Sequence, residues 1–378
     1  MKLFRTALCV AAFGACAAAQ VVSFGFPAGS PEDQASDSIA KENDLQKKLA
    51  LLNDFVQKFS SNPVAVAYGQ WQIAQAYQAA GDLKAARAAG DRALAAEPNA
   101  MDVLVALVNI SQQAKDNAAT VMYATKAAAA YGSIALQPKP EAVSAADFES
   151  MVKGQQASAQ SAYDFVQGAA FNAIVAEQAP EARVKMAQEF SAAFPASSYS
   201  AAVAQYAIMS LLQSSDFAGL STYGEQAIKD NPQNSALLLM VSQGYSQDQK
   251  SSAHLERAAV YAKKVTVLAQ ADSSLSPEQK NATIGAAKSV IGWSLLRQDK
   301  AAAAIPELKD AAPMLKSSPD DYSSVLYGLA FAYARLNRLP EAKAVLAEAV
   351  NVTGPYQELS RELLQKVNSA KPAPARKQ

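Results

Sequence analysis

The sequence has little of the chemistry on which most enzymes and metalloproteins depend. Its two cysteines are Cys9 and Cys16, and its single histidine is His254, which we expect at the surface beside a short insertion. No catalytic triad, His-rich metal site or Cys-ligated metal is therefore predicted. The chain also lacks a Walker loop and a G-x-G-x-x-G motif, so no cofactor is expected.

An excess of charge of either sign is also missing. Lys and Arg together number 34, and so do Asp and Glu, while charged residues make up only 18% of the chain. A nucleic-acid-binding protein needs a basic excess or stripe to neutralise phosphates. This balance therefore excludes nucleic acid as an expected partner.

The N-terminus has the pattern of a signal peptide. Lys2 and Arg5 precede the apolar run 6–15, and small residues at 17–19 fit an A-x-A cleavage site. We predict a signal peptide over 1–19 and an exported protein of the periplasm or cell envelope. Both cysteines would leave with it, unless "FGAC" serves as a lipoprotein box. In that alternative Cys16 is lipidated and the chain is an outer-membrane lipoprotein; otherwise it is periplasmic or secreted, and no membrane association is expected.

Alanine dominates what is present. It makes up roughly a fifth of the chain and is the strongest helix former, which predicts an all-α fold. A spacing of 12 and then 7 residues recurs among small or apolar positions. It relates Ala74, Ala86 and Ala93; Val108, Thr120 and Ala127; Ile208, Leu220 and Ala227; Gly292, Ala304 and Ala311; and Ala330, Ala342 and Ala349.

These positions resemble the tetratricopeptide repeat (TPR), a helix–turn–helix unit of about 34 residues. The copy at 67–100 matches through Ile73, Ala74, Tyr77, Gly81, Asp82, Leu83, Ala86, Ala93, Leu94 and Pro98, and the copy at 323–356 matches through Leu329, Ala330, Tyr333, Ala342 and Ala349. More degenerate copies lie near 101–134, 163–196, 201–234, 235–265 and 285–318. With the leader, the chain resembles an exported TPR protein of the bacterial type. The resemblance implies a right-handed α-solenoid of about seven helix pairs.

The expected organisation follows from these assignments. Residues 20–36 contain Gly, Pro and Ser without a helical period, which predicts a flexible linker. The solenoid is expected over 37–368, with a helical insertion near 135–160, and a disordered tail over 369–378. At the repeat turn, Gly81 is suited to a positive φ, and Asp82 is suited to cap the next helix.

The resemblance also implies a binding face, because the first helix of each TPR lines a concave groove. The family's groove positions correspond to Tyr68, Trp71, Gln75, Asn109, Gln112, Gln205, Trp293, Arg297, Tyr327 and Phe331, and also to Gln243, Ser289 and Arg335. Aromatic residues and arginine are typical binding anchors, and amides can hydrogen-bond a peptide backbone. An alternative interpretation packs Trp71 and Trp293 between repeats. The basic positions of the family's carboxylate clamp hold Trp71, Gln75 and Asn109, so that specificity is not expected.

The predicted function is a non-enzymatic scaffold or adaptor in envelope assembly or organisation. It would bind a protein or peptide partner on the concave face. Two alternatives stay open: a cell-wall-acting enzyme, for which the repeats leave no separate catalytic domain, and a solenoid that binds a small ligand.

Overall fold

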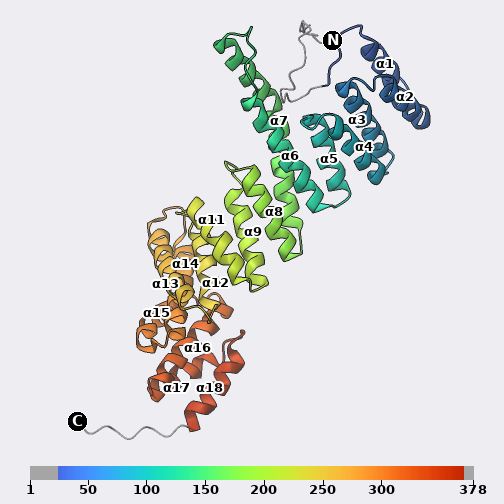
Figure 1. Cartoon of the computed structure of the whole chain (residues 1–378). Coiled ribbons are helices and arrows are strands. Elements are labelled where there is room, and N and C mark those ends of the chain that lie inside the picture. Colours follow the sequence, from blue (N-terminus) through green and yellow to red (C-terminus); the bar gives the residue numbers. More distant parts are fainter. Residues whose placement is uncertain (1–23, 370–378) are drawn as a thin grey trace. The chain divides into compact units, whose positions relative to one another are not determined.

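The computed structural model describes residues 24–369, and every regular element in that range is a helix (Figure 1). The predicted signal peptide at 1–19, with Cys16, lies outside the described residues, and so does the tail predicted over 369–378, except for Ser369, which ends a helix. The chain divides into two compact units, unit 1 up to Val203 and unit 2 from Ala204 onward.

Over its described residues, 24–203, unit 1 contains eight helices and the start of a ninth. They are α1 (Pro31–Ala40), α2 (Leu45–Lys58), α3 (Pro63–Ala79), α4 (Leu83–Ala96), α5 (Met101–Gln113), α6 (Asn117–Leu136), α7 (Ala145–Ala176), α8 (Pro180–Ala193) and α9 (Ser200–Gln213). The boundary between the units falls within α9.

Unit 2 is also helical over its described residues and begins with the rest of α9. Its helices are α10 (Phe217–Gly219), a π-helical turn η1 (Leu220–Gly224), α11 (Glu225–Asp230), α12 (Ser235–Gln247), α13 (Ser252–Ala271), α14 (Pro277–Arg297), α15 (Ala301–Met314), α16 (Pro319–Arg335), α17 (Leu339–Ala349) and α18 (Gln357–Ser369).

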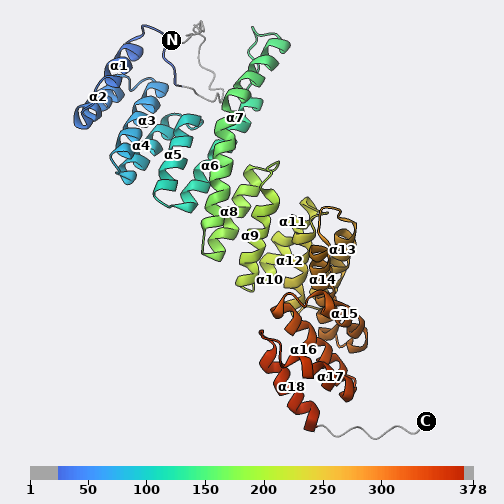
Figure 2. The same cartoon turned by 180° about the vertical axis from the view of Figure 1, so that it is seen from behind.

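Helices pack against their neighbours in a regular order within each unit. In unit 1, α3 packs on α4 and α5 on α6, and α5 also contacts α3 and α7. Figures 1 and 2 show these pairs side by side from both directions. In unit 2, α12, α14, α16 and α18 contact one another in sequence, beside the pairs α12–α13, α14–α15 and α16–α17. Contacts between next-but-one helices are typical of stacked helix pairs, so the predicted all-α solenoid is confirmed.

The same turn joins the two helices of five pairs. Gly81 has φ of 80°, and Asp82 accepts a hydrogen bond from Ala85 N, as predicted. The same left-handed position recurs without glycine: Lys115, Ser215, Asp299 and Asn337 have φ between 55° and 61°. After each of these residues, the next backbone N–H bonds back to the preceding helix, as Asp82 N does to Tyr77 O at 3.0 Å. This closure ends the first helix and fixes the direction of the second.

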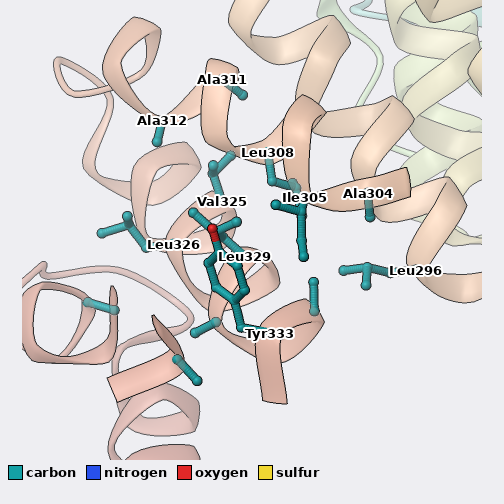
Figure 3. Packing of buried hydrophobic residues seen from close by; sticks show 14 of the residues in the cluster. Leu296, Ala304, Ile305, Leu308, Ala311, Ala312, Val325, Leu326, Leu329 and Tyr333 are labelled. Atoms are coloured by element: carbon teal, nitrogen blue, oxygen red, sulfur yellow. The ribbon is translucent and has the colours of Figure 1, made fainter. Parts of the chain in front are cut away.

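The small positions of the repeat lie at helix crossings. All fifteen residues of the 12-and-7 spacing are buried, and Ala86, Ala304 and Ala342 are 0% exposed. Figure 3 shows Ala304, Leu308 and Ala311 of α15 gathered with residues of α16. Small side chains at such points let two helices approach to about 8–10 Å. The register inferred from the sequence is therefore confirmed at these positions.

Overpacking a crossing tests this register. Replacing Ala86 or Ala342 by leucine adds side-chain atoms where no solvent-exposed surface remains. We expect each variant to lose about 1–3 kcal/mol of stability and to melt at a lower temperature. Ala88→Leu and Ala344→Leu, at exposed positions of the same helices, are the matched controls. Thermal midpoints equal to those of the controls would contradict the assignment.

Two segments differ from the sequence-based expectation. The flexible linker predicted over 20–36 is wrong for its second half, because α1 begins at Pro31 with Ser30 as its N-cap. The cap and the proline at the first helical position outweigh the local lack of periodicity. The insertion expected near 135–160 is not a separate element, since its helical part runs without a break into the repeat as the 32-residue helix α7.

Candidate functional site

The predicted groove residues of unit 2 come together on α14 and α16. The ring of Trp293 lies 6.2 Å from that of Tyr327, and Tyr327 lies 6.1 Å from Phe331. Tyr356, which precedes α18, lies 5.7 Å from Trp293 and 5.4 Å from Tyr327. We call these four residues the unit-2 aromatic surface. Its rings are half-buried, so they belong neither to the core nor to an isolated exposed position.

Arg297 is next to this surface. Its guanidinium lies 5.1 Å from the centre of the Trp293 ring and donates a hydrogen bond to the Ser246 carbonyl at the end of α12. Arg297 forms no ion pair within residues 24–369. Burial lowers the pKa of Arg297 from its usual range, and Tyr356 opposes that shift. Because a guanidinium has five N–H donors, Arg297 keeps donors for an incoming acceptor.

A groove of about 680 Å³ adjoins these side chains. Trp293, Arg297 and Tyr356 line it together with polar residues of α12, α14 and α16. The remaining lining residues are Leu212, Gln243, Ser246, Gln247, Gln249, Ala286, Ser289, Val290, Asp321 and Ser324. The Trp293 indole donates to Ser324 Oγ at 3.0 Å, which fixes the ring at the groove's edge. The groove thus combines aromatic faces, amides, hydroxyls, a carboxylate and a cation.

The α12 wall of the groove is held by a buried polar network. His254 contacts Asp248 Oδ2 through Nδ1 at 2.7 Å and stacks on Tyr245 at 4.4 Å. Tyr245 donates to Glu225 Oε1 at 2.7 Å, and Tyr261 donates to Glu225 Oε2 at 2.5 Å. Burial and the Glu225 hydrogen bond raise the pKa of Tyr245 to about 12. The expectation that His254 lies at the surface is wrong, since its side chain is 17% exposed.

A second aromatic surface lies in unit 1, on α3. Tyr68 and Trp71, both predicted groove positions, lie 6.2 Å apart. They do not face solvent freely, because Phe24 stacks on Trp71 at 5.2 Å and Phe26 meets Tyr68 edge-on at 5.2 Å. The Trp71 Nε1 atom is buried and has no hydrogen-bond partner among the described residues. An unsatisfied buried donor costs about 1–3 kcal/mol.

The other predicted residues lie elsewhere. Gln75 lines a cavity of about 420 Å³ between α2 and α3, and Gln112 lines one of about 390 Å³ between α5, α6 and α7. Asn109 is half-buried on α5 and lines neither of these cavities. Gln205 is half-buried on α9 and does not line the unit-2 groove. These four residues therefore do not line the unit-2 groove.

Sequence reasoning missed several residues of both surfaces. Tyr356 lies at the last position of the 323–356 repeat, outside the helix to which groove positions were transferred. Ser246 follows Gln243, the last position transferred on its helix, and Ser324 precedes Tyr327, the first position transferred on its helix. Phe24 and Phe26 fell within the predicted linker, where their alternating apolar pattern was the available signal.

The described part of the chain contains neither a membrane-spanning helix nor a cluster of metal ligands. Among the helices of residues 24–369, none combines the length and apolarity needed to cross a membrane. In the same part of the chain, no group of three or more His, Cys, Asp or Glu side chains is placed to hold a metal ion.

In the comparisons with known proteins, the chain resembles solved structures only. No family model and no curated protein matches the chain. The chain is similar to the APC/C hetero-tetramer Cut9–Hcn1, with 13% identity, 89% of this chain and 63% of that chain covered, and a TM-score of 0.42. It thus spans less than two thirds of that chain.

Two further structures cover more of their own length. The TPR domain of P58(IPK) shows 13% identity over 90% of this chain and 98% of that chain, with a TM-score of 0.30. Yeast Tom70 shows 10% identity over 89% of this chain and 94% of that chain, with a TM-score of 0.29. The assignment of the fold rests on the helix pairing described above.

Proposed function

We propose that the chain is a non-enzymatic, TPR-like scaffold that binds an extended segment of a protein partner on unit 2. The observation that carries this proposal is the unit-2 aromatic surface beside a polar groove. Aromatic residues and arginine supply most of the energy in many interfaces. Placement in the cell envelope, with a role in its assembly or organisation, rests on the predicted signal peptide alone.

Different side chains of the site would contact different groups of the partner. The rings of Trp293, Tyr327 and Phe331 offer half-buried faces for an apolar anchor of the partner. Gln243 and Gln247 can donate to and accept from a peptide backbone, which suits an extended segment. Arg297, which forms no ion pair in the described structure, favours a partner with a carbonyl or carboxylate near the anchor.

The proposal predicts a loss of affinity on changing Arg297. Peptides are selected from a random display library against the full chain, and their affinities are measured by fluorescence polarisation. Hydrogen bonds to charged groups contribute about 1.5–3 kcal/mol, so Arg297→Gln should weaken binding about 10- to 100-fold. Phe331→Ala should also weaken binding, by removal of one ring of the surface.

The matched control is Val260→Ala, at an exposed position of α13 where Val260 is 61% exposed. Circular dichroism first establishes that each variant keeps its helices. Equal affinity of the wild type, Arg297→Gln and Phe331→Ala for every selected peptide would contradict the proposed binding site.

The size of the groove favours a second candidate, the binding of a small molecule. Its volume of about 680 Å³ lies inside the range of about 300–1,000 Å³ found for ligand pockets. A thermal shift caused by a small polar metabolite, abolished in Arg297→Gln and unaffected by the selected peptides, would favour this function over the scaffold.

A further inference from the structure

The first described residues lie across the α3 surface as a ligand would. Phe24 and Phe26 are half-buried, whereas Gly25 between them is exposed. This alternation places two rings, one residue apart, on the same side of the backbone. Phe24 contacts Tyr68 and Trp71 at 5.9 and 5.2 Å, and Phe26 contacts Tyr68 and Phe55 at 5.2 and 6.0 Å.

On its C-terminal side, the segment is tied to α1 by two backbone donors. Ser30 N donates to the Pro27 carbonyl at 3.0 Å, and Gly29 N donates to Asp33 Oδ2 at 2.8 Å, which ties the turn to α1. Within the described residues, the backbone of 24–26 forms no hydrogen bond with α2 or α3. The rings therefore carry the contact with α3.

The contact between residues 24–26 and α3 leaves a buried donor of α3 without an acceptor among the described residues. The Nε1 atom of Trp71, whose ring stacks on Phe24, is buried and has no acceptor in the described structure. An extended segment could place two rings on this surface and also offer a backbone carbonyl to this donor. Such a segment would satisfy the buried donor, which residues 24–26 do not. A ligand of that kind has an advantage that the chain's own segment lacks.

We propose that the α3 surface is a second binding surface, for an extended partner segment with two aromatic side chains one residue apart, and that Phe24–Phe26 is its exchangeable resident. The resident competes from within the same chain, so its effective concentration is high. A partner in trans therefore binds weakly until the resident is released or removed. This inference concerns unit 1 and does not depend on the function proposed for unit 2.

The test removes the resident and supplies it in trans. Full-length Phe24→Ala/Phe26→Ala is titrated against fluorescein-labelled SFGFPAGS, the sequence of residues 23–30. We expect at least tenfold tighter binding by this variant than by the wild type. Adding Trp71→Ala should abolish the binding, and the peptide SAGAPAGS should not bind. A peptide with one phenylalanine should bind at least tenfold more weakly than SFGFPAGS.

A direct readout comes from Trp71 itself. The chain has two tryptophans, so Trp293→Phe leaves Trp71 as the single emitter. In that background, Phe24→Ala/Phe26→Ala should shift the emission to longer wavelength, and SFGFPAGS should reverse the shift. If the double variant loses helicity, Phe24→Ala alone is used, because Phe24 contacts only Tyr68 and Trp71 among the aromatic rings of the described structure.

Equal affinity of wild type and variant for the peptide, or no binding by the folded variant, would overturn the proposal and leave Phe24–Phe26 as ordinary packing. Binding that survives Trp71→Ala would do the same. Wild-type dimers that disappear in Phe24→Ala/Phe26→Ala would also overturn it, by assigning the surface to the segment of a second copy.

Discussion

Replacing Leu308 by alanine is expected to lower the free energy of unfolding of unit 2 by about 2–5 kcal/mol. Leu308 is 0% exposed and points from α15 into the crossing with α14 and α16 (Figure 3). A Cβ atom added at Gly292 would lie 2.5 Å from Leu308 Cγ, and one added at Gly328 would lie 3.4 Å from Leu308 Cδ1. The leucine thus fills the space that two glycines leave open, and alanine would leave a cavity.

A second substitution separates this explanation from a general loss of helix stability. Gly292→Ala alone should destabilise the chain, because its Cβ meets a buried leucine. In the Leu308→Ala background, the same methyl group enters the vacated space, so its effect should be smaller or reversed. Urea unfolding of all four chains, followed by circular dichroism, gives the coupling free energy between the two sites.

Lys309→Ala, at an exposed position of the same helix, provides the control and should change stability by no more than about 0.5 kcal/mol. If Leu308→Ala is no more destabilising than Lys309→Ala, then Leu308 does not hold the α14–α15–α16 crossing. Additive effects of Gly292→Ala and Leu308→Ala would show that the two side chains do not share one space.

The repeat positions could be predicted from the sequence because they depend on local size and turn chemistry. Ala86 and Ala342 are small because a helix crosses there, and Gly81 followed by Asp82 ends one helix and begins the next. The same turn at Lys115 and Ser215 carries no glycine, so composition gave less indication of it. There the backbone closure of the turn holds a left-handed residue that its side chain does not favour.

Helices α1 and α7 differ from the sequence-based prediction for another reason. The helix α1 depends on Ser30 as a cap and on contacts that are distant in sequence, such as Asn62 Nδ2 donating to Glu32 Oε1 at 3.3 Å. A window of sequence does not contain such contacts. The sequence pattern predicts an insertion and a repeat as two separate helical segments, whereas the structure joins them in the single helix α7. No residue between the two segments breaks a helix.

The candidate site likewise contains residues that the sequence predicts and residues that it does not. Trp293, Arg297, Tyr327 and Phe331 come together because they lie at groove positions of successive first helices, which the repeat predicts. Tyr356 joins them from the segment before α18, outside the helix to which groove positions were transferred. Likewise, Phe24 and Phe26 reach Tyr68 and Trp71 through a fold-back of the chain, and this depends on tertiary packing.

Replacing Glu225 by alanine is expected to lower the free energy of unfolding by about 2–4 kcal/mol. Glu225 accepts from the hydroxyls of Tyr245 and Tyr261, and Tyr245 is 0% exposed. Without the carboxylate, the buried Tyr245 hydroxyl loses its charged acceptor, while half-buried Tyr261 can turn to water. Arg257, whose side chain is 54% exposed, should contribute little to the loss.

Glu225→Gln is the matched variant, because its amide oxygen can still accept from Tyr245, and we expect a smaller loss of about 1 kcal/mol. The effect should also depend on pH. The folded pKa of Tyr245, about 12, lies above its ordinary value of 10.0. A raised tyrosine pKa contributes stability that is present below pH 10.0 and is lost as the pH rises through the folded value. The gap in stability between wild type and Glu225→Ala should therefore narrow above pH 10.0.

Ultraviolet titration of the tyrosines supplies the measurement, since Glu225→Ala should move the delayed ionisation of Tyr245 to lower pH. The same change bears on the unit-2 groove, because Tyr245 stacks on His254 and immediately precedes Ser246, whose carbonyl accepts from Arg297. We expect Glu225→Ala to weaken peptide binding at the groove and Glu225→Gln to preserve it. Unchanged tyrosine titration together with unchanged affinity would show that this network neither shields Tyr245 nor positions the α12 wall.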